Sequence, residues 1–160
     1  MADRTVIAIT TDHYPYGLHL YEYSQLAGFT VDEAFGKYKN TFILWNPAME
    51  PVTIDDPCCT VDILPTLSNL FGLTYDSRLM MGRDVLSDSM PIAILSNQSF
   101  ITDRVMFDSS TGKATVLTEE PLPDGYLDAM IEYVKTKFTV STAMLNTDYY
   151  SYVIPRPAAE

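Results

Sequence analysis

The stretch over residues 5–17, T-V-I-A-I-T-T-D-H-Y-P-Y-G, limits what this chain can fold into more than any other part of it. Its apolar run, V-I-A-I, is typical of a strand that is buried on both faces of a parallel sheet. Two threonines follow the run, and Asp12 and His13 come directly after them. Pro15 then turns the chain away. The stretch therefore predicts a central strand that presents an Asp-His pair at its carboxyl end.

Asp12 and His13 are candidate ligands of a metal ion. In open α/β sheets, ligands bind at the carboxyl ends of the strands. A carboxylate oxygen and a neutral imidazole nitrogen together suit Mn, Zn or a similar divalent ion. The pattern also allows a turn carboxylate beside a half-buried imidazole, because a strand can end in Asp-His without binding a metal. Tyr14 is interpreted as a plain surface or core tyrosine, with packing beside the metal site as the alternative, and His19 as a solvated side chain.

Composition disfavours two classes of general partner. A chain of 160 residues is long enough for one domain with a hydrophobic core. Its net charge of -11, from 10 basic and 21 acidic residues, disfavours nucleic acid and anionic lipid as general partners, because an acidic surface repels both. No apolar run approaches the roughly 20 residues that span a bilayer, so we expect a soluble chain. The first residues carry no signal-peptide core, and a start directly before a central strand suggests a truncated protein.

The first third of the chain is predicted to alternate short helices, strands and loops. Residues 20–38 predict one or two short helices, with Thr30 and Glu33 at the spacing of a capping box. The run N-T-F-I-L-W over residues 40–45 predicts a second buried strand, which an Asn-Pro pair closes. Residues 50–57 predict a polar connection.

A helix with one apolar face is predicted to start at Asp62. Asp62 is interpreted as its cap, with a ligand role as the alternative, and Pro65 is tolerated because it falls in the first turn. Gly72 ends the helix. The apolar face consists of Ile63, Leu67, Leu70 and Phe71.

Two further groups of side chains are interpreted as structural. Cys58 and Cys59 are adjacent, and because a disulfide between neighbours is strained, we expect two free thiols. Residues 75–87 predict a structured loop. Its Arg78, Arg83 and Asp84 are expected to pair with one another, with contact to a substrate as the alternative.

The last third of the chain predicts a hairpin followed by helices. Residues 92–95 form a third apolar run, and the D-S-S-T-G segment between residues 99–107 and 113–117 is a hairpin signature. Ser141 is interpreted as the cap of a separate last helix. The core stripe of the preceding long helix consists of Leu127, Met130, Ile131, Val134 and Phe138. The mixture predicts an α/β protein with an α+β tail.

Several stretches, taken in order and spacing, resemble a known family. They are T-T-D-H-Y-P-Y-G-L, N-T-F-I-L-W-N-P, V-D-I-L-P-T-L-S-N-L-F-G-L, Y-D-S-R-L-M-M-G-R-D-V-L-S and the closing K-F-T-V-S-T-A-M-L-N-T-D-Y-Y. Together they resemble the carboxyl-terminal part of the lipoteichoic acid synthase-like sulfatase family, which belongs to the alkaline phosphatase superfamily. The resemblance runs from residue 5 to about residue 152.

The resemblance implies an alkaline phosphatase/sulfatase-like α/β fold. Such a fold has a mostly parallel sheet with helices and a small antiparallel carboxyl-terminal subdomain. Residues 1–95 would then be the carboxyl-terminal part of the α/β core, and residues 96–160 the hairpin and closing helices of the same domain.

The resemblance also implies an enzyme tethered by amino-terminal helices at the extracellular face of a bacterial membrane. Enzymes of this family transfer phosphoglycerol from a phospholipid to a growing polymer, with a threonine nucleophile and a divalent metal. Mn is the usual metal, and Zn, Mg or Ca are alternatives. The metal pair of the family maps onto Asp12 and His13. Its glutamate ligand and its threonine lie upstream in the family and match no part of this chain, so we expect the chain alone to be inactive.

Two other functions stay open. A sulfatase-type hydrolase would act on sulfate esters and would differ in its nucleophile, which also lies upstream in the family. A non-catalytic binding or assembly module would have kept the fold and lost the chemistry. The isolated chain is further expected to self-associate, since a central strand without its neighbours leaves an open sheet edge.

Overall fold

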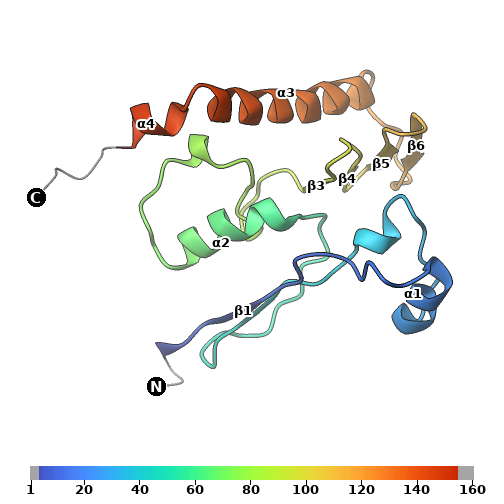
Figure 1. Cartoon of the computed structure of the whole chain (residues 1–160), viewed down its shortest axis with the longest axis horizontal. Coiled ribbons are helices and arrows are strands. Elements are labelled where there is room, and N and C mark those ends of the chain that lie inside the picture. Colours follow the sequence, from blue (N-terminus) through green and yellow to red (C-terminus); the bar gives the residue numbers. More distant parts are fainter. Residues whose placement is uncertain (1–3, 155–160) are drawn as a thin grey trace, which may run out of the picture. The chain divides into compact units, whose positions relative to one another are not determined.

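The computed structural model describes residues 4–154 of the chain. The chain divides into two compact units, Met1–Ile54 and Asp55–Glu160 (Figure 1). Helices mix with antiparallel strands in these units, which is compatible with the predicted α/β class. No helix within residues 4–154 is both long and apolar enough to cross a membrane. The predicted division of a larger domain into residues 1–95 and 96–160 stays a prediction.

The first unit contains a two-stranded antiparallel sheet. β1 (Ile7–Ile9) pairs with β2 (Ile43–Trp45), and Ile7 lies opposite Trp45. The strands are present where the sequence predicted them, but the parallel, fully buried arrangement is not found among the described residues. Ile7 is 43% exposed and Ile9 is 55% exposed. The apolar run forms a strand by its own preference, but no second layer covers it here.

Two short helices lie between these strands, as predicted. α1 (Leu20–Ala27) ends at Gly28, whose positive φ of 76° suits glycine, and η2 (Gly36–Tyr38) follows. The predicted capping box at Thr30 and Glu33 is wrong, because no helix starts there. Asp32 instead accepts hydrogen bonds from the backbone amides of Phe35 and Gly36, at 2.8 and 3.0 Å, and leads the chain into η2.

A four-stranded antiparallel sheet forms the centre of the second unit. Its strands β3 (Ile92–Ile94), β4 (Phe100–Thr102), β5 (Val105–Asp108) and β6 (Lys113–Val116) pair in chain order. The predicted hairpin is confirmed as β5–β6, which Gly112 closes with a φ of 71°. Residues 99–107 do not form one strand as predicted, since a turn between β4 and β5 divides them.

The long helix α3 (Tyr126–Asn146) packs its predicted stripe against this sheet (Figure 1). Met130 and Val134 belong to the buried core, and Leu127, Ile131 and Phe138 are partly buried against it. The prediction that Ser141 caps a separate helix is wrong. The segment S-T-A-M-L contains no helix breaker, so α3 continues to Asn146 before α4 (Tyr149–Val153) begins.

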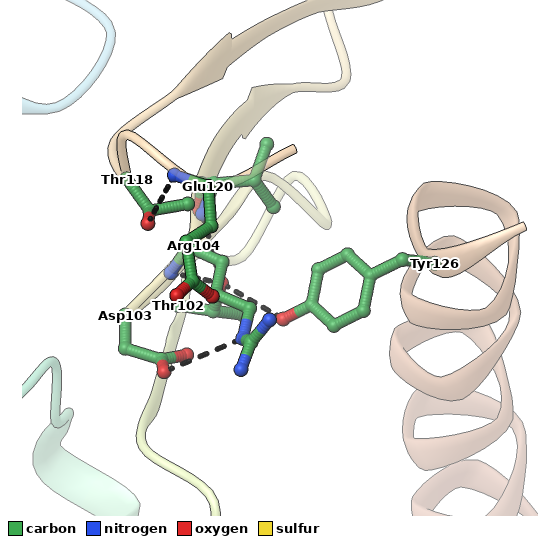
Figure 2. Close-up of polar contacts among 7 residues, drawn as sticks. Thr102, Asp103, Arg104, Thr118, Glu120 and Tyr126 are labelled. Carbon is green, nitrogen blue, oxygen red and sulfur yellow. Dashed lines mark hydrogen bonds and ion pairs between the residues drawn. The ribbon is translucent and has the colours of Figure 1, made fainter. Parts of the chain in front are cut away.

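A buried threonine joins the turn between β4 and β5 to the start of α3. The Thr102 hydroxyl accepts hydrogen bonds from the amides of Arg104 and Val105 and from the Tyr126 hydroxyl, at 3.1, 3.0 and 3.1 Å (Figure 2). Asp103 and Arg104 form an exposed ion pair of 3.8 Å at the same turn. The turn therefore fixes where α3 enters the core.

The predicted helix after residue 60 consists of two parts, and its buried face differs from the prediction. η3 (Thr60–Asp62) runs directly into α2 (Ile63–Leu70). The buried residues of α2 are Pro65, Thr66 and Ser68, whereas Leu70 and Phe71 are exposed. The apolar face of α2 is only partly covered by the described residues, so an apolar pattern alone did not identify the packed side.

Asp62 is a buried structural carboxylate. It is 4% exposed, and its oxygens accept hydrogen bonds from the backbone amides of Cys59 and Arg83, both at 2.8 Å. Asp62 occupies the position before α2, as predicted, but its side chain makes no capping hydrogen bond to that helix. It bonds instead to the start of η3 and to a loop 21 residues further along the chain.

The loop over residues 75–87 is structured, as predicted, and contains the short helix η4 (Ser77–Leu79). Arg78, Arg83 and Asp84 do not pair with one another as predicted. Arg78 pairs with Asp76 at 2.6 Å, and Asp84 accepts a hydrogen bond from Asn69 at 2.8 Å. Cys58 and Cys59 are free thiols, which confirms that prediction.

Candidate functional site

Asp12 and His13 lie in a bend just beyond the end of β1. The Nε2 atom of His13 lies 3.5 Å from Oδ1 of Asp12. Both side chains reach solvent, with exposed fractions of 47% for His13 and 89% for Asp12. The two candidate ligands are therefore close together and accessible to a small ion.

A hydrogen bond to the backbone sets the orientation of the His13 ring. Nδ1 of His13 lies 2.7 Å from the carbonyl oxygen of Tyr14. A carbonyl oxygen can only accept, so Nδ1 is the donor, and in the neutral ring Nε2 keeps its lone pair. This nitrogen faces the Asp12 carboxylate. A histidine that donates its other N–H to a carbonyl has the usual arrangement of a metal ligand.

An aromatic cluster lies beside His13. The His13 ring stacks on Tyr16 with a centroid distance of 4.5 Å and an interplanar angle of 22°. Tyr14 contacts Tyr16 and Tyr38 edge-on, at 4.7 and 5.3 Å. The ammonium group of Lys37 lies over the rings of Tyr14 and Tyr38, at 5.4 and 5.0 Å. Of this cluster only Tyr14 was predicted as a possible neighbour of the pair, although the Y-P-Y run directly after Asp12 and His13 is a local signal for it.

The pair is an incomplete set of metal ligands. Within residues 4–154, no group of three or more His, Cys, Asp or Glu side chains could hold a metal ion. Asp32, in the same unit, already accepts hydrogen bonds from two backbone amides. His19 lies at the start of α1, where its ring stacks on Tyr21 at a centroid distance of 5.8 Å. One carboxylate and one imidazole fit Mn or Zn by type, and further ligands would complete the coordination.

Sequence comparison identifies a known protein that is similar to this chain. No family model matches it. The lipoteichoic acid synthase-like protein YvgJ of Bacillus subtilis strain 168 is 30% identical to it over 159 residues. This chain is similar to that lipoteichoic acid synthase-like protein over most of its own length. The alignment covers 91% of this chain and 25% of YvgJ, so the chain spans about a quarter of the length of that relative.

The relationship to a lipoteichoic acid synthase-like protein confirms the family resemblance that the sequence motifs indicated. The similarity to YvgJ supports a relationship to a family of enzymes. The metal, its ligands and the substrate stay predictions, since similarity over a quarter of YvgJ does not test them.

Proposed function

We propose that this chain is part of the catalytic domain of a metal-dependent phosphoglycerol transferase of the lipoteichoic acid synthase-like type. Its substrates would be phosphate esters of phospholipids at the outer face of a bacterial membrane. The observation that carries the proposal is the convergence of Asp12 Oδ1 and His13 Nε2, 3.5 Å apart, with the other ring nitrogen held by a carbonyl. The 30% identity to YvgJ supports the type of enzyme.

In this proposal, Asp12 and His13 supply two ligands to a divalent ion, with Mn the first choice. Such an ion neutralises charge on a phosphoryl group and lowers the pKa of an attacking hydroxyl. Asp12 contributes the negative charge that draws the cation, and His13 contributes a neutral nitrogen whose direction Tyr14 and Tyr16 fix. The nucleophile and the remaining ligands are proposed to come from other segments of a longer protein.

The test is an assay of the longer protein that contains this chain, with labelled phosphatidylglycerol as substrate and Mn present. Asp12→Ala and His13→Ala should each lower turnover by more than about a hundredfold, because loss of a ligand exceeds the 10- to 100-fold cost of losing a partner of a ligand. His19→Ala is the matched control and should leave turnover unchanged. Full activity in both ligand variants would contradict the proposal.

The same assay separates the alternatives. Turnover of a chromogenic sulfate ester, without transfer of phosphoglycerol, would assign a sulfatase-type hydrolase. No turnover of either substrate by the longer protein, with its fold intact, would favour a non-catalytic binding or assembly module.

A further inference from the structure

A second site-like feature lies in the unit Asp55–Glu160 and uses neither Asp12 nor His13. It is a cavity of about 100 Å³ between η3, the loop that follows η4, β3 and α3. Its polar lining consists of Cys59, Asp62, Arg83, Ser89, Tyr133 and Lys137. This volume exceeds the ~30 Å³ that one water molecule occupies in the liquid, so the cavity has room for a small polyatomic ligand.

The charge of this cavity is positive, in a chain whose net charge is -11. Arg83 and Lys137 contribute two cations, and Asp62 contributes the one carboxylate among the lining residues. Both oxygens of Asp62 already accept hydrogen bonds from backbone amides. Burial, with the Asp62 charge nearby, raises the pKa of the Cys59 thiol to about 11, so the thiol adds no negative charge at neutral pH. Two cations against one satisfied carboxylate favour an anion.

The two cations have donor groups to spare. The buried Nε of Arg83 has no hydrogen-bond partner among the described residues. The other guanidinium nitrogens make longer contacts, at 3.2 Å to the Pro57 carbonyl and 3.4 Å to the Ser89 carbonyl. Lys137 donates to the Met81 carbonyl at 2.7 Å, which uses one of the three protons of an ammonium group. Buried donors without acceptors are costly, and an anion would supply acceptors.

The backbone places Arg83 at the cavity by close contact. Gly82 lies so near η3 that a Cβ there would collide with the Val61 carbonyl and the Asp62 amide. The amide of Arg83 is held in turn by Asp62. The position of the arginine is therefore fixed by packing before any ligand arrives.

We infer that this cavity binds a small tetrahedral oxyanion, of the phosphate or sulfate class, through Arg83 and Lys137. An oxyanion of this class has several acceptor oxygens, which match the unpartnered Nε–H of Arg83 and the remaining protons of Lys137. The shared chemistry allows a free ion or the terminal phosphate of a small ester.

Calorimetric titration of inorganic phosphate into the 160-residue chain at low ionic strength tests the inference. We expect saturable binding to one site. Lys137→Gln and Arg83→Gln should each weaken binding by about tenfold or more, the value of one charged hydrogen bond. Lys135→Gln removes the same charge from an exposed position of α3 and should leave the affinity within about twofold, while Lys137→Arg should retain binding. Binding that both cavity variants leave unchanged, or no saturable binding, would overturn the inference.

Two further measurements sharpen the outcome. Sulfate and glycerol 3-phosphate titrations distinguish the source, since glycerol 3-phosphate binding at least as tightly as phosphate supports an esterified ligand, and much weaker binding supports a free ion. If the substitutions unfold the chain, NMR of the unmodified chain decides. The Arg83 Nε–H resonance should shift and saturate with added phosphate, and a resonance that stays in place would refute the inference. Asp12→Ala should change neither result, which separates this site from the proposed catalytic function.

Discussion

At the scale of single residues, the His13 imidazole is restrained on two sides. The Tyr14 carbonyl holds Nδ1, and the Tyr16 ring covers one face. These contacts orient a ligand but do not add one. An oriented pair of ligands gains some affinity from preorganisation, yet it still lacks the coordination number that Zn or Mn requires.

We therefore expect the 160-residue chain to bind Mn or Zn only weakly, with a dissociation constant well above about 1 μM, because two ligands leave the site incomplete. Calorimetry measures this directly, with His19→Ala as a control that should change nothing. A sub-micromolar affinity that Asp12→Ala abolishes would show that the chain contains the complete site.

Cys59 gives a prediction about pH. Burial is the main cause that raises the pKa of its thiol from 9.0 to about 11 in the folded chain. The folded state therefore favours the protonated thiol, and its contribution to stability is full below pH 9 and is lost as pH rises to about 11. Denaturant titrations across this window should show a falling free energy of unfolding. Cys59→Ala should make the fall shallower, and an identical slope in the variant would contradict the assignment.

At the scale of elements, α3 offers a matched comparison on one helix. Val134 is 1% exposed and lies in the core, whereas Val140 is 45% exposed. Val134→Ala should lower the free energy of unfolding by about 1–3 kcal/mol, since it removes two buried methyl groups. Val140→Ala should cost less than about 0.5 kcal/mol. Equal costs in denaturant titration would mean that α3 presents a different face to the sheet.

A comparison of several elements shows which features the sequence can predict and which it cannot. The stripe of α3 and the β5–β6 hairpin depend on local spacing and turn residues, and both are confirmed. The bond from the Arg83 amide to Asp62 joins positions 21 residues apart, and no local pattern encodes such a partner. Asp12 and His13 are candidate ligands on local grounds because they follow a strand, whereas Tyr38 and Lys37 contact the neighbouring Tyr14 only through the fold.

At the scale of the whole molecule, the first unit leaves apolar strand residues uncovered. Ile9 and Ile43 are 55% and 51% exposed, and they lie opposite each other in a sheet of two strands. A two-stranded sheet is marginal in water, and exposed apolar edges recruit further strands.

We expect the isolated chain to self-associate through β1 and β2, and its net charge of -11 should favour a defined oligomer over a precipitate. Light scattering with size-exclusion chromatography measures the mass. Ile9→Lys should shift the chain towards monomer, because a charge on the strand disfavours pairing between copies. Leu145→Lys, at a 71% exposed position of α3, is the control and should leave the mass unchanged. A monomer in the unmodified chain would refute the expectation.

The chain order of β3, β4, β5 and β6 has a consequence for the time course of folding. Each strand pairs with the next through a short turn, and the Tyr126–Thr102 bond then attaches α3 only 24 residues away. The pairing of Ile7 with Trp45, by contrast, must close a loop of nearly forty residues. Short loops close at lower entropic cost, and contacts between near neighbours form sooner. After dilution from denaturant, the second unit should therefore acquire its strands early, and β1, which leads to Asp12 and His13, should be ordered last.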